Sequence, residues 1–238
     1  WLWPHQQPSP LSALRLSPNR KRQQVALCYL LGAAALAALA YVLRHTGWGL
    51  WLLYPAVSCL FVAVSYGLMG AQGFQKLANG RHSLASTLCL VPYTLMAYLN
   101  SHYWLRNKAL IVPVMDGAYL GSIRADVPHD MAMLDLCAEL PCYQPSVQYV
   151  AQPMLDLIAP SAEDLRLAVQ QLEVLQKSGK VFVCCALGYS RSASVVLAWL
   201  MYTHRAQTLQ DAMAIVQKAR PQIVLSTAHI QSIQESLS

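Results

Sequence analysis

The stretch KVFVCCALGYSRS at positions 180–192 decides how the second half of this chain folds. Its opening run, Lys180 to Cys184, predicts a buried strand, and the run from Ser192 to Thr203 is rich in Val, Ala and Leu and predicts a helix. A loop that enters a helix N-terminus directs several backbone N–H groups at one point, where an anion can bind. The order of strand, loop and helix therefore predicts an anion site between these two elements.

Three side chains in this loop add chemistry to the anion site. The loop amides and the helix dipole favour the thiolate form of Cys185 at the loop's beginning. Arg191, six residues later, returns to the same place with a planar fork that can hold two phosphate oxygens. Gly188 permits a backbone turn that a side chain would obstruct. A nucleophile, an anion cradle and a guanidinium together indicate phosphoryl transfer to sulfur.

These residues resemble the signature of the cysteine-dependent protein tyrosine phosphatases, specifically the dual-specificity group. Cys185, Gly188, Arg191 and Ser192 match the signature, and the resemblance covers the chain from about residue 110 to 238. It implies that the interior of the loop binds phosphate and that Ser192 helps the thiolate leave; that interior comprises Ala186, Leu187, Gly188, Tyr189 and Ser190. One position departs from the family, because Cys184 stands where a histidine usually organises the loop and stabilises the thiolate.

The resemblance also implies a general acid, an aspartate about thirty residues before the nucleophile. Asp156 lies in the segment PMLDLIAP (153–160), after an expected strand and before an expected helix, as the family pattern requires. Asp164 fits less well because it belongs to the first turn of that helix, and Asp135 fits less well because it lies inside a strand. The alternative role for Asp156 is a cap that merely precedes the helix.

Short apolar runs alternate with amphipathic stretches from residue 110 onward and predict an α/β sandwich around a mainly parallel sheet. Ser161 is a good N-cap for a helix that reaches about Gln176 and ends before Gly179. Further strands are expected at 110–114, 118–120, 131–136 and 147–150, with a turn at 116–117, and further helices at 209–219 and 226–237.

The two halves of the chain differ in charge. Hydrophobic residues make up 55% of the 238 residues and charged residues 12%, where about 25% is typical of soluble domains. Residues 1–115 contain nine Lys/Arg and no Asp or Glu, whereas residues 116–238 contain eight Lys/Arg and all eleven acidic residues. We therefore expect residues 1–109 to form a leader and membrane helices, and residues 110–238 to form a catalytic domain.

The apolar runs of the first half predict two or three membrane helices. Residues 25–43 and 48–69 are long enough to span. A third apolar run, residues 84–99, is shorter and contains Pro92, and an aromatic belt extends this expected span to residue 104. The alternative for the first run is a cleaved signal peptide, which fits less well because the run exceeds the usual apolar core of such peptides. The leader, residues 1–18, is Pro-rich, and the first residue is Trp rather than Met, which is compatible with a trimmed chain preceded by further helices.

The side of the membrane follows from the number of spans. Cytoplasmic segments of membrane proteins carry an excess of Lys and Arg. The leader together with Arg20 to Arg22 is basic, and so is the loop that contains Lys76 and Arg81, whereas the first loop carries Arg44 alone. We therefore expect the leader and the second loop to lie in the cytoplasm. Two spans then leave the catalytic domain in the cytoplasm, and three place it outside. A reactive thiol favours the reducing cytoplasm. Since no eukaryotic targeting signal is evident, we expect a bacterial inner-membrane protein with a cytoplasmic catalytic domain.

The remaining candidates point to structure rather than chemistry. Free cysteines are usually buried as small hydrophobic residues, which we expect of Cys28, Cys59, Cys89, Cys137 and Cys184. Cys137 and Cys142 could form a disulfide in an oxidising compartment. Metal-ligand spacing is absent, so we expect no metal and no cofactor, and the basic run at 20–22 indicates topology rather than nucleic-acid binding.

The sequence as a whole predicts a membrane-anchored phosphatase that acts on phosphate monoesters through a phosphocysteine. The loop interior carries no Lys or His, which favours phosphotyrosine or phosphoserine/threonine in proteins. The membrane tether favours a lipid phosphate such as phosphatidylglycerophosphate, which a similar family hydrolyses. An inactive, membrane-anchored phosphate-binding module is the alternative from another class. The expected partners are therefore a phosphorylated protein or phospholipid and the lipid bilayer.

Overall fold

The computed structural model describes residues 19–238, and the expected leader at 1–18 lies outside the described residues. The described chain divides into two compact units. The first, the hairpin unit, comprises residues 19–75 and 84–95. The second comprises residues 76–83 and 96–238, and we call it the catalytic unit because it contains Cys185, the expected nucleophile. The short segment 76–83 therefore lies in the apolar half of the sequence but belongs to the catalytic unit.

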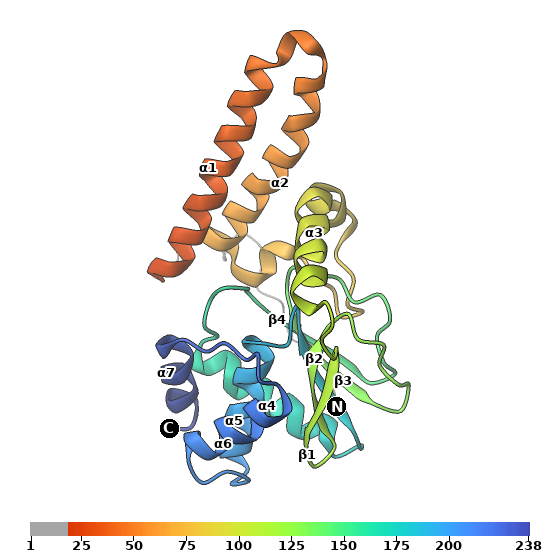
Figure 1. Cartoon of the computed structure of the whole chain (residues 1–238), viewed down its shortest axis with the longest axis vertical. Helices are drawn as coiled ribbons and strands as arrows, with labels where there is room; N and C mark the ends of the chain where they lie inside the picture. Colours follow the sequence, from red (N-terminus) through yellow and green to blue (C-terminus); the bar gives the residue numbers. More distant parts are fainter. Residues whose placement is uncertain (1–18) are drawn as a thin grey trace, which may run out of the picture. The chain divides into compact units, whose positions relative to one another are not determined.

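The hairpin unit is built on two long apolar helical segments that run side by side (Figure 1). Helix α1 (Arg20–Val42) begins at Asn19, whose side chain accepts hydrogen bonds from the backbone N–H groups of Lys21 and Arg22. The returning segment is continuous from Trp48 to Phe74 and consists of η2 (Trp48–Leu52), α2 (Leu53–Val64), η3 (Ser65–Met69) and η4 (Gly70–Phe74).

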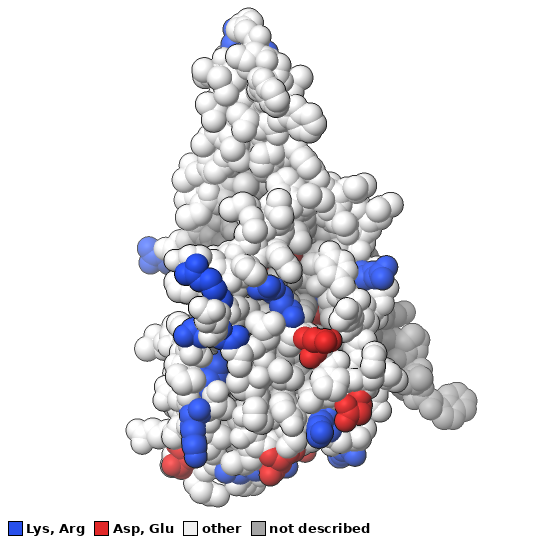
Figure 2. All heavy atoms as spheres, turned by 45° about the vertical axis from the view of Figure 1, so that its right-hand side comes forward, with Lys and Arg blue, Asp and Glu red and all other residues white. Residues whose placement is uncertain are grey.

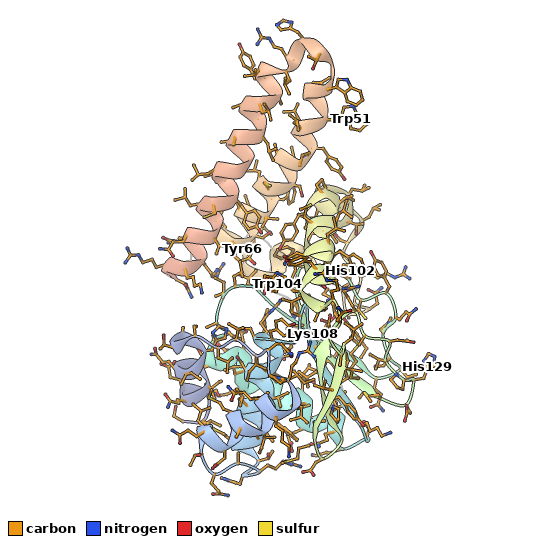
Figure 3. The ribbon with its side chains drawn as sticks, viewed as in Figure 1. Trp51, Tyr66, His102, Trp104, Lys108 and His129 are labelled. Carbon is orange, nitrogen blue, oxygen red and sulfur yellow. The ribbon has the colours of Figure 1, made fainter. Side chains whose placement is uncertain are left out.

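Aromatic rings form the inner contact of the hairpin unit. Tyr66 is buried, stacks on Tyr29 of α1 and meets the ring of Phe74 edge-on. Tyr93, on the first half of α3 (Leu84–Leu105), packs against Tyr29 and Phe74. Figure 3 shows Tyr66 beside the helices and Trp51 near the turn of the hairpin.

Two helical segments in the described residues are long and apolar enough to cross a membrane: Arg20–Val42 and Trp48–Phe74. They correspond to the first two expected spans. The third expected span forms a helix, α3, that continues through Pro92 to Leu105, but this helix is not among the two. The face of the hairpin seen in Figure 2 is almost free of Lys, Arg, Asp and Glu.

The catalytic unit contains a five-stranded sheet in the order β1-β2-β5-β3-β4. β1 pairs with β2 in antiparallel fashion, and all other neighbours are parallel. The sheet is therefore mixed but mainly parallel, as expected of an α/β fold. The strands are β1 (Ile111–Met115), β2 (Ala118–Ser122), β3 (Ala132–Cys137), β4 (Tyr149–Met154) and β5 (Val181–Cys185).

Four helices cover one face of this sheet (Figure 1). They are α4 (Ala162–Gln176), α5 (Arg191–Tyr202), α6 (Leu209–Ala219) and α7 (Thr227–Ser236). Because side chains alternate along a strand, Val181, Val183 and Cys185 of β5 face these helices. Phe182 and Cys184 face the opposite side, where connecting loops supply most of the cover.

The expected strand at 147–150 differs most from the structure, since β4 runs from Tyr149 to Met154 through Pro153, whereas the other expected strands are displaced or extended by one or two residues. Proline removes a backbone donor and normally argues against a strand, but it is tolerated at a sheet edge. Both β4 and β1, which contains Pro113, are edge strands.

Candidate active site

The candidate residues gather at the carboxyl ends of the parallel strands, the usual ligand-binding edge of an α/β sheet. Cys185 is the last residue of β5, and its Cα lies opposite that of Ser122, the last residue of β2. Glu139 follows β3 and Asp156 follows β4 by two residues each. Arg191 opens α5, so four strands and one helix N-terminus contribute to one location.

The Cys185 thiol is held by one hydrogen-bonding group from its own loop and one from the first turn of α5. The backbone N–H of Gly188 donates to Sγ at 3.2 Å, and the Ser192 hydroxyl lies 3.2 Å from the same sulfur. Both groups therefore lie within hydrogen-bonding distance of the expected nucleophile. The first residue of the loop is held in place because the Ser122 hydroxyl donates to the Ala186 carbonyl at 2.6 Å.

Gly188 occupies a position where only glycine fits. Its φ is +74°, in the left-handed region. A Cβ atom there would lie 2.6 Å from the carbonyl carbon and oxygen of Gly121 in β2. The predicted role of Gly188 in the turn therefore has two causes, the backbone conformation and the close approach of a strand.

Cys184 is separated from the loop chemistry by the sheet. It faces the loop-covered side among Met133, Phe182 and Ala186 and is fully buried. Burial raises the pKa of its thiol well above the ordinary value, because the thiolate cannot be solvated there. This cysteine is a buried small hydrophobic residue, as expected, and its side chain points away from that of Cys185.

Arg191 is the most heavily engaged side chain of the site. Its Nη1 donates to Glu139 Oε2 at 2.8 Å and to the Met154 carbonyl at 2.9 Å. Its Nη2 donates to Glu139 Oε1 at 2.5 Å and to Asp156 Oδ1 at 3.0 Å. Burial disfavours the charged guanidinium, but the two carboxylates outweigh it and raise the pKa further. Nε, also buried, has no hydrogen-bond partner within residues 19–238. A donor of this kind suits a phosphate oxygen.

Glu139 is the site residue that sequence reasoning missed. It is buried and holds both Nη atoms of Arg191 in a two-point clamp. Burial would raise the pKa of this carboxyl, but the adjacent guanidinium outweighs burial and lowers it, so Glu139 remains ionised. The signal in the sequence is a single acid within the apolar run LCAEL (136–140).

Asp156, the general acid expected from the sequence, lies within hydrogen-bonding distance of Arg191. Burial raises the pKa of its carboxyl, and the Arg191 charge opposes the rise without cancelling it. The alternatives have other partners. Asp164 closes the capping box of α4 with Ser161, and Asp135 lies inside β3, where it binds Lys76.

The outer wall of the loop is braced by residues that the sequence did not reveal. Arg220 donates to the Leu187 carbonyl at 2.7 Å and lies over the Tyr189 ring, and the Val224 N–H donates to the Tyr189 carbonyl. The Ser190 hydroxyl donates to the Val224 carbonyl and contacts His229 Nε2 at 3.0 Å. On the other side the Tyr189 hydroxyl donates to the carbonyl of Trp104, which lies with His102 on the C-terminal part of α3 (Figure 3).

All seven cysteines are free thiols, so the pairing of Cys137 with Cys142 is not formed. Within residues 19–238, no three His, Cys, Asp or Glu side chains gather in a way that could hold a metal ion.

Comparisons with known proteins support the same reading of the catalytic unit. Residues 125–237 match the family "Dual specificity phosphatase, catalytic domain". The chain is 28% identical over 128 residues to "Putative tyrosine phosphatase 123R" of Invertebrate iridescent virus 6. This alignment covers 51% of the chain and 88% of the viral protein. These matches support a phosphatase of the dual-specificity and tyrosine-phosphatase type.

Solved structures of this type also align with the chain. The crystal structure of Tk-PTP in the active form is 26% identical, covers 54% of this chain and 96% of its own, and has a TM-score of 0.48. The crystal structure of human DUSP28 is 24% identical, covers 54% and 93%, and has a TM-score of 0.46. The structure of PTPMT1 in complex with PI(5)P is 17% identical, covers 54% and 95%, and has a TM-score of 0.47.

Proposed function

We propose that this protein is a membrane-anchored phosphatase that hydrolyses phosphate monoesters through a phosphocysteine intermediate. The observation that carries the proposal is the loop itself. Cys185 Sγ faces the Gly188 N–H and the Ser192 hydroxyl, at the start of a loop that ends on a buried arginine whose Nε–H is unpaired within the described chain.

In the first step the Cys185 thiolate attacks phosphorus and the bond from phosphorus to the leaving oxygen breaks. Arg191 and the backbone N–H groups of residues 186–190 hold the three equatorial oxygens, where negative charge accumulates. Asp156 gives its proton to the leaving oxygen. Its raised pKa serves this role, because the carboxyl must be protonated when the substrate binds.

In the second step a water molecule attacks the phosphocysteine. Asp156, now a carboxylate, takes the proton from that water, the bond between sulfur and phosphorus breaks, and inorganic phosphate leaves. The Ser192 hydroxyl, 3.2 Å from Sγ, donates a hydrogen bond to the departing thiolate. The enzyme thereby returns to its starting state.

The test is hydrolysis of p-nitrophenyl phosphate by the full chain in detergent, with Cys185→Ser as the variant. We expect turnover to fall by on the order of 10⁴-fold or more, because a serine hydroxyl without a base is a poor nucleophile. Cys184→Ala is the matched control, since the neighbouring thiol faces the other side of the sheet and its loss should change kcat less than about threefold. Full activity of the Cys185→Ser protein would contradict the mechanism. No hydrolysis by the unchanged chain would support the inactive phosphate-binding module instead.

A phosphorylated protein side chain is the proposed substrate, and a lipid phosphate is the second candidate. The loop interior carries no Lys or His that would read additional phosphates, which supports the first. The apolar hairpin supports the second, because it would hold the catalytic unit near lipid headgroups. Phosphotyrosine, phosphoserine and phosphothreonine peptides, compared with phosphatidylglycerophosphate in mixed micelles, distinguish the two by kcat/KM.

We infer that the chain crosses the membrane twice, with the catalytic unit in the cytoplasm of a bacterial cell. Segment 76–83 is part of the catalytic unit, so the loop that follows the second span lies on the same side as that unit. Helix α3 starts from this loop and ends at β1, so both its ends are on that side and it does not cross. Basic residues flank the pair of spans at 20–22 and at 76 and 81, against Arg44 alone at the turn, which favours a cytoplasmic placement.

A further inference from the structure

A short turn between the second apolar segment and α3 packs into the catalytic unit. Residues 76 and 82 form an isolated antiparallel bridge, and the N–H of Leu77 donates to the Arg81 carbonyl at 2.8 Å. Gly80 has a φ of +81°, and a Cβ atom there would lie 2.8 Å from Cys142 and from the Tyr149 hydroxyl. The turn is therefore closely fitted against the loop that connects β3 to β4.

Lys76 uses all three of its N–H donors inside the catalytic unit. Nζ donates to Asp135 Oδ2 at 2.5 Å, to the Cys137 carbonyl at 2.6 Å and to the Leu140 carbonyl at 2.9 Å. The side chains of Lys76 and Asp135 are both fully inaccessible to solvent. Asp135 is fixed in turn by the Tyr149 hydroxyl at 2.6 Å and by the backbone N–H of Cys137 at 2.8 Å.

Two further hydrogen bonds join the turn to the same loop. His82 Nε2 lies 2.9 Å from the Ala138 carbonyl, and the backbone N–H of Cys142 donates to the Gly80 carbonyl at 2.8 Å. His82 is buried, and burial lowers its pKa, so the neutral ring donates this bond. The carbonyl groups of residues 137, 138 and 140 are thus all bound by side chains of segment 76–83.

These carbonyls flank Glu139, the residue that clamps Arg191. The connection from β3 to β4 has neither helix nor strand between residues 138 and 148, so no ladder of backbone hydrogen bonds fixes it. The position of Glu139 then depends on what holds its neighbours. Since Glu139 binds both Nη atoms of Arg191, the orientation of the guanidinium depends on it in turn.

We propose that Lys76 and His82 are positioning residues for the catalytic arginine: they hold the backbone on both sides of Glu139, and Glu139 holds Arg191 in the orientation that receives phosphate. The inference rests on the phosphatase function proposed above. Replacing a buried ion pair with apolar side chains is often neutral or stabilising. A fully buried lysine whose three donors all reach this one region therefore fits a positional role better than a contribution to stability alone.

The experiment is a double-mutant cycle on the full chain in detergent, with p-nitrophenyl phosphate as substrate and rates expressed per folded molecule. We expect Lys76→Met and Glu139→Gln each to lower kcat by about 10- to 100-fold, because an arginine misplaced by about 1 Å loses transition-state contacts. The kcat of the double variant should be within about threefold of the kcat of the less active single variant, since both changes remove the same support. Lys180→Met is the matched control, because Lys180 makes only an exposed contact with Asp130 and should stay within about twofold.

A lysine with a purely structural role would lower the folded fraction and the melting temperature but not kcat per folded molecule, which would overturn the proposal. Strictly multiplicative effects in the double variant would overturn it as well. If the Lys76→Met protein does not fold, His82→Leu should lower kcat several-fold and His82→Gln should restore it, because the glutamine amide can donate to the Ala138 carbonyl. An unchanged, folded His82→Leu protein would contradict the proposal. Failure of the proposed function itself is separate, because then the unchanged chain would not hydrolyse the substrate.

Discussion

Helices α1 and α5 are both rich in Ala, Leu and Val, yet they bury very different shares of their residues. Of the 23 residues of α1 only Ala33 and Ala40 are buried, whereas ten of the 12 residues of α5 are buried. Large apolar side chains of α1 face outward, among them Leu27, Leu30, Leu31 and Leu39. Apolar composition thus does not distinguish a core helix from a membrane helix; the two helices differ in how much of the described chain covers them, and the exposed apolar surface of α1 is what the proposed membrane placement would cover.

The largest expected effect concerns the side of the membrane on which each part of the chain lies. We expect cysteines introduced at Asn79 and Tyr143 to share one side, and a cysteine at His45 in the hairpin turn to lie on the other. All three positions are exposed. The measurement is labelling of intact cells by a membrane-impermeant maleimide, in chains whose seven native cysteines are replaced.

The expected result is all or none, with His45→Cys labelled without permeabilisation and the other two labelled only after it. Opposite labelling of Asn79→Cys and Tyr143→Cys would mean that α3 crosses the membrane, against the two-span topology. Equal labelling of all three positions would mean that the hairpin does not cross the membrane.

Replacing an arginine with lysine should lower kcat/KM in the catalytic unit but not in the hairpin unit. Arg191→Lys is expected to lower kcat/KM by about 10²- to 10³-fold, because an ammonium lacks the planar fork that binds both Glu139 oxygens side by side and leaves separate N–H groups aimed at phosphate. Arg44→Lys, in the exposed turn of the hairpin, is the control and should leave kcat/KM unchanged. Hydrolysis of p-nitrophenyl phosphate checks both, and a folded Arg191→Lys protein with normal kcat/KM would contradict the assigned role.

A third test concerns the proton that the catalytic unit supplies. Burial raises the pKa of Asp156, with Arg191 opposing. The carboxyl donates only when protonated, so its contribution is present below this pKa and is lost as the pH rises through it. Because the pKa is raised, that loss should come at a higher pH than an ordinary aspartic acid would give.

The Asp156→Asn variant should lower kcat about 10²-fold with an alkyl phosphate substrate and should abolish the fall in kcat on the basic side. The measurement is the pH profile of kcat for both proteins. Retention of the basic limb in Asp156→Asn would show that another group is the acid. Asp164→Asn is the matched control, because it alters a nearby carboxylate that closes the α4 capping box.

The catalytic unit could be predicted from sequence in most of its elements because its signals are local. Ser161 starts α4 through a capping box, and the apolar run before Cys185 forms β5. The extent of β4 could not be predicted, because proline normally ends a strand and only the sheet order shows that β4 is an edge strand that tolerates Pro153.

The supporting residues of the site could not be predicted because their partners are distant in sequence. Glu139 lies 52 positions from Arg191, and Lys76 lies 59 positions from Asp135. Lys76 also lies in the half of the chain that composition assigns to the membrane. Charge counts there indicate topology, and only the three-dimensional contacts reveal that one of these charges supports the catalytic unit.

The smallest expected effect comes from a matched pair of exposed apolar residues, Leu31 in α1 and Val174 in α4, each 61% exposed. If α1 lies in lipid, Leu31→Lys places a charge near the middle of a 23-residue span and costs about 2.5–3.5 kcal/mol of insertion free energy. Val174→Lys adds a charge to a surface in water and should change the stability of the catalytic unit by less than about 0.5 kcal/mol. The long apolar span offsets part of the first cost, so the measured change is a partial shift of the chain from the membrane to the soluble fraction on carbonate extraction. Identical fractionation of the two variants would place both residues in the same medium, and the difference between α1 and α5 would then need a protein partner, not a bilayer, to cover the hairpin.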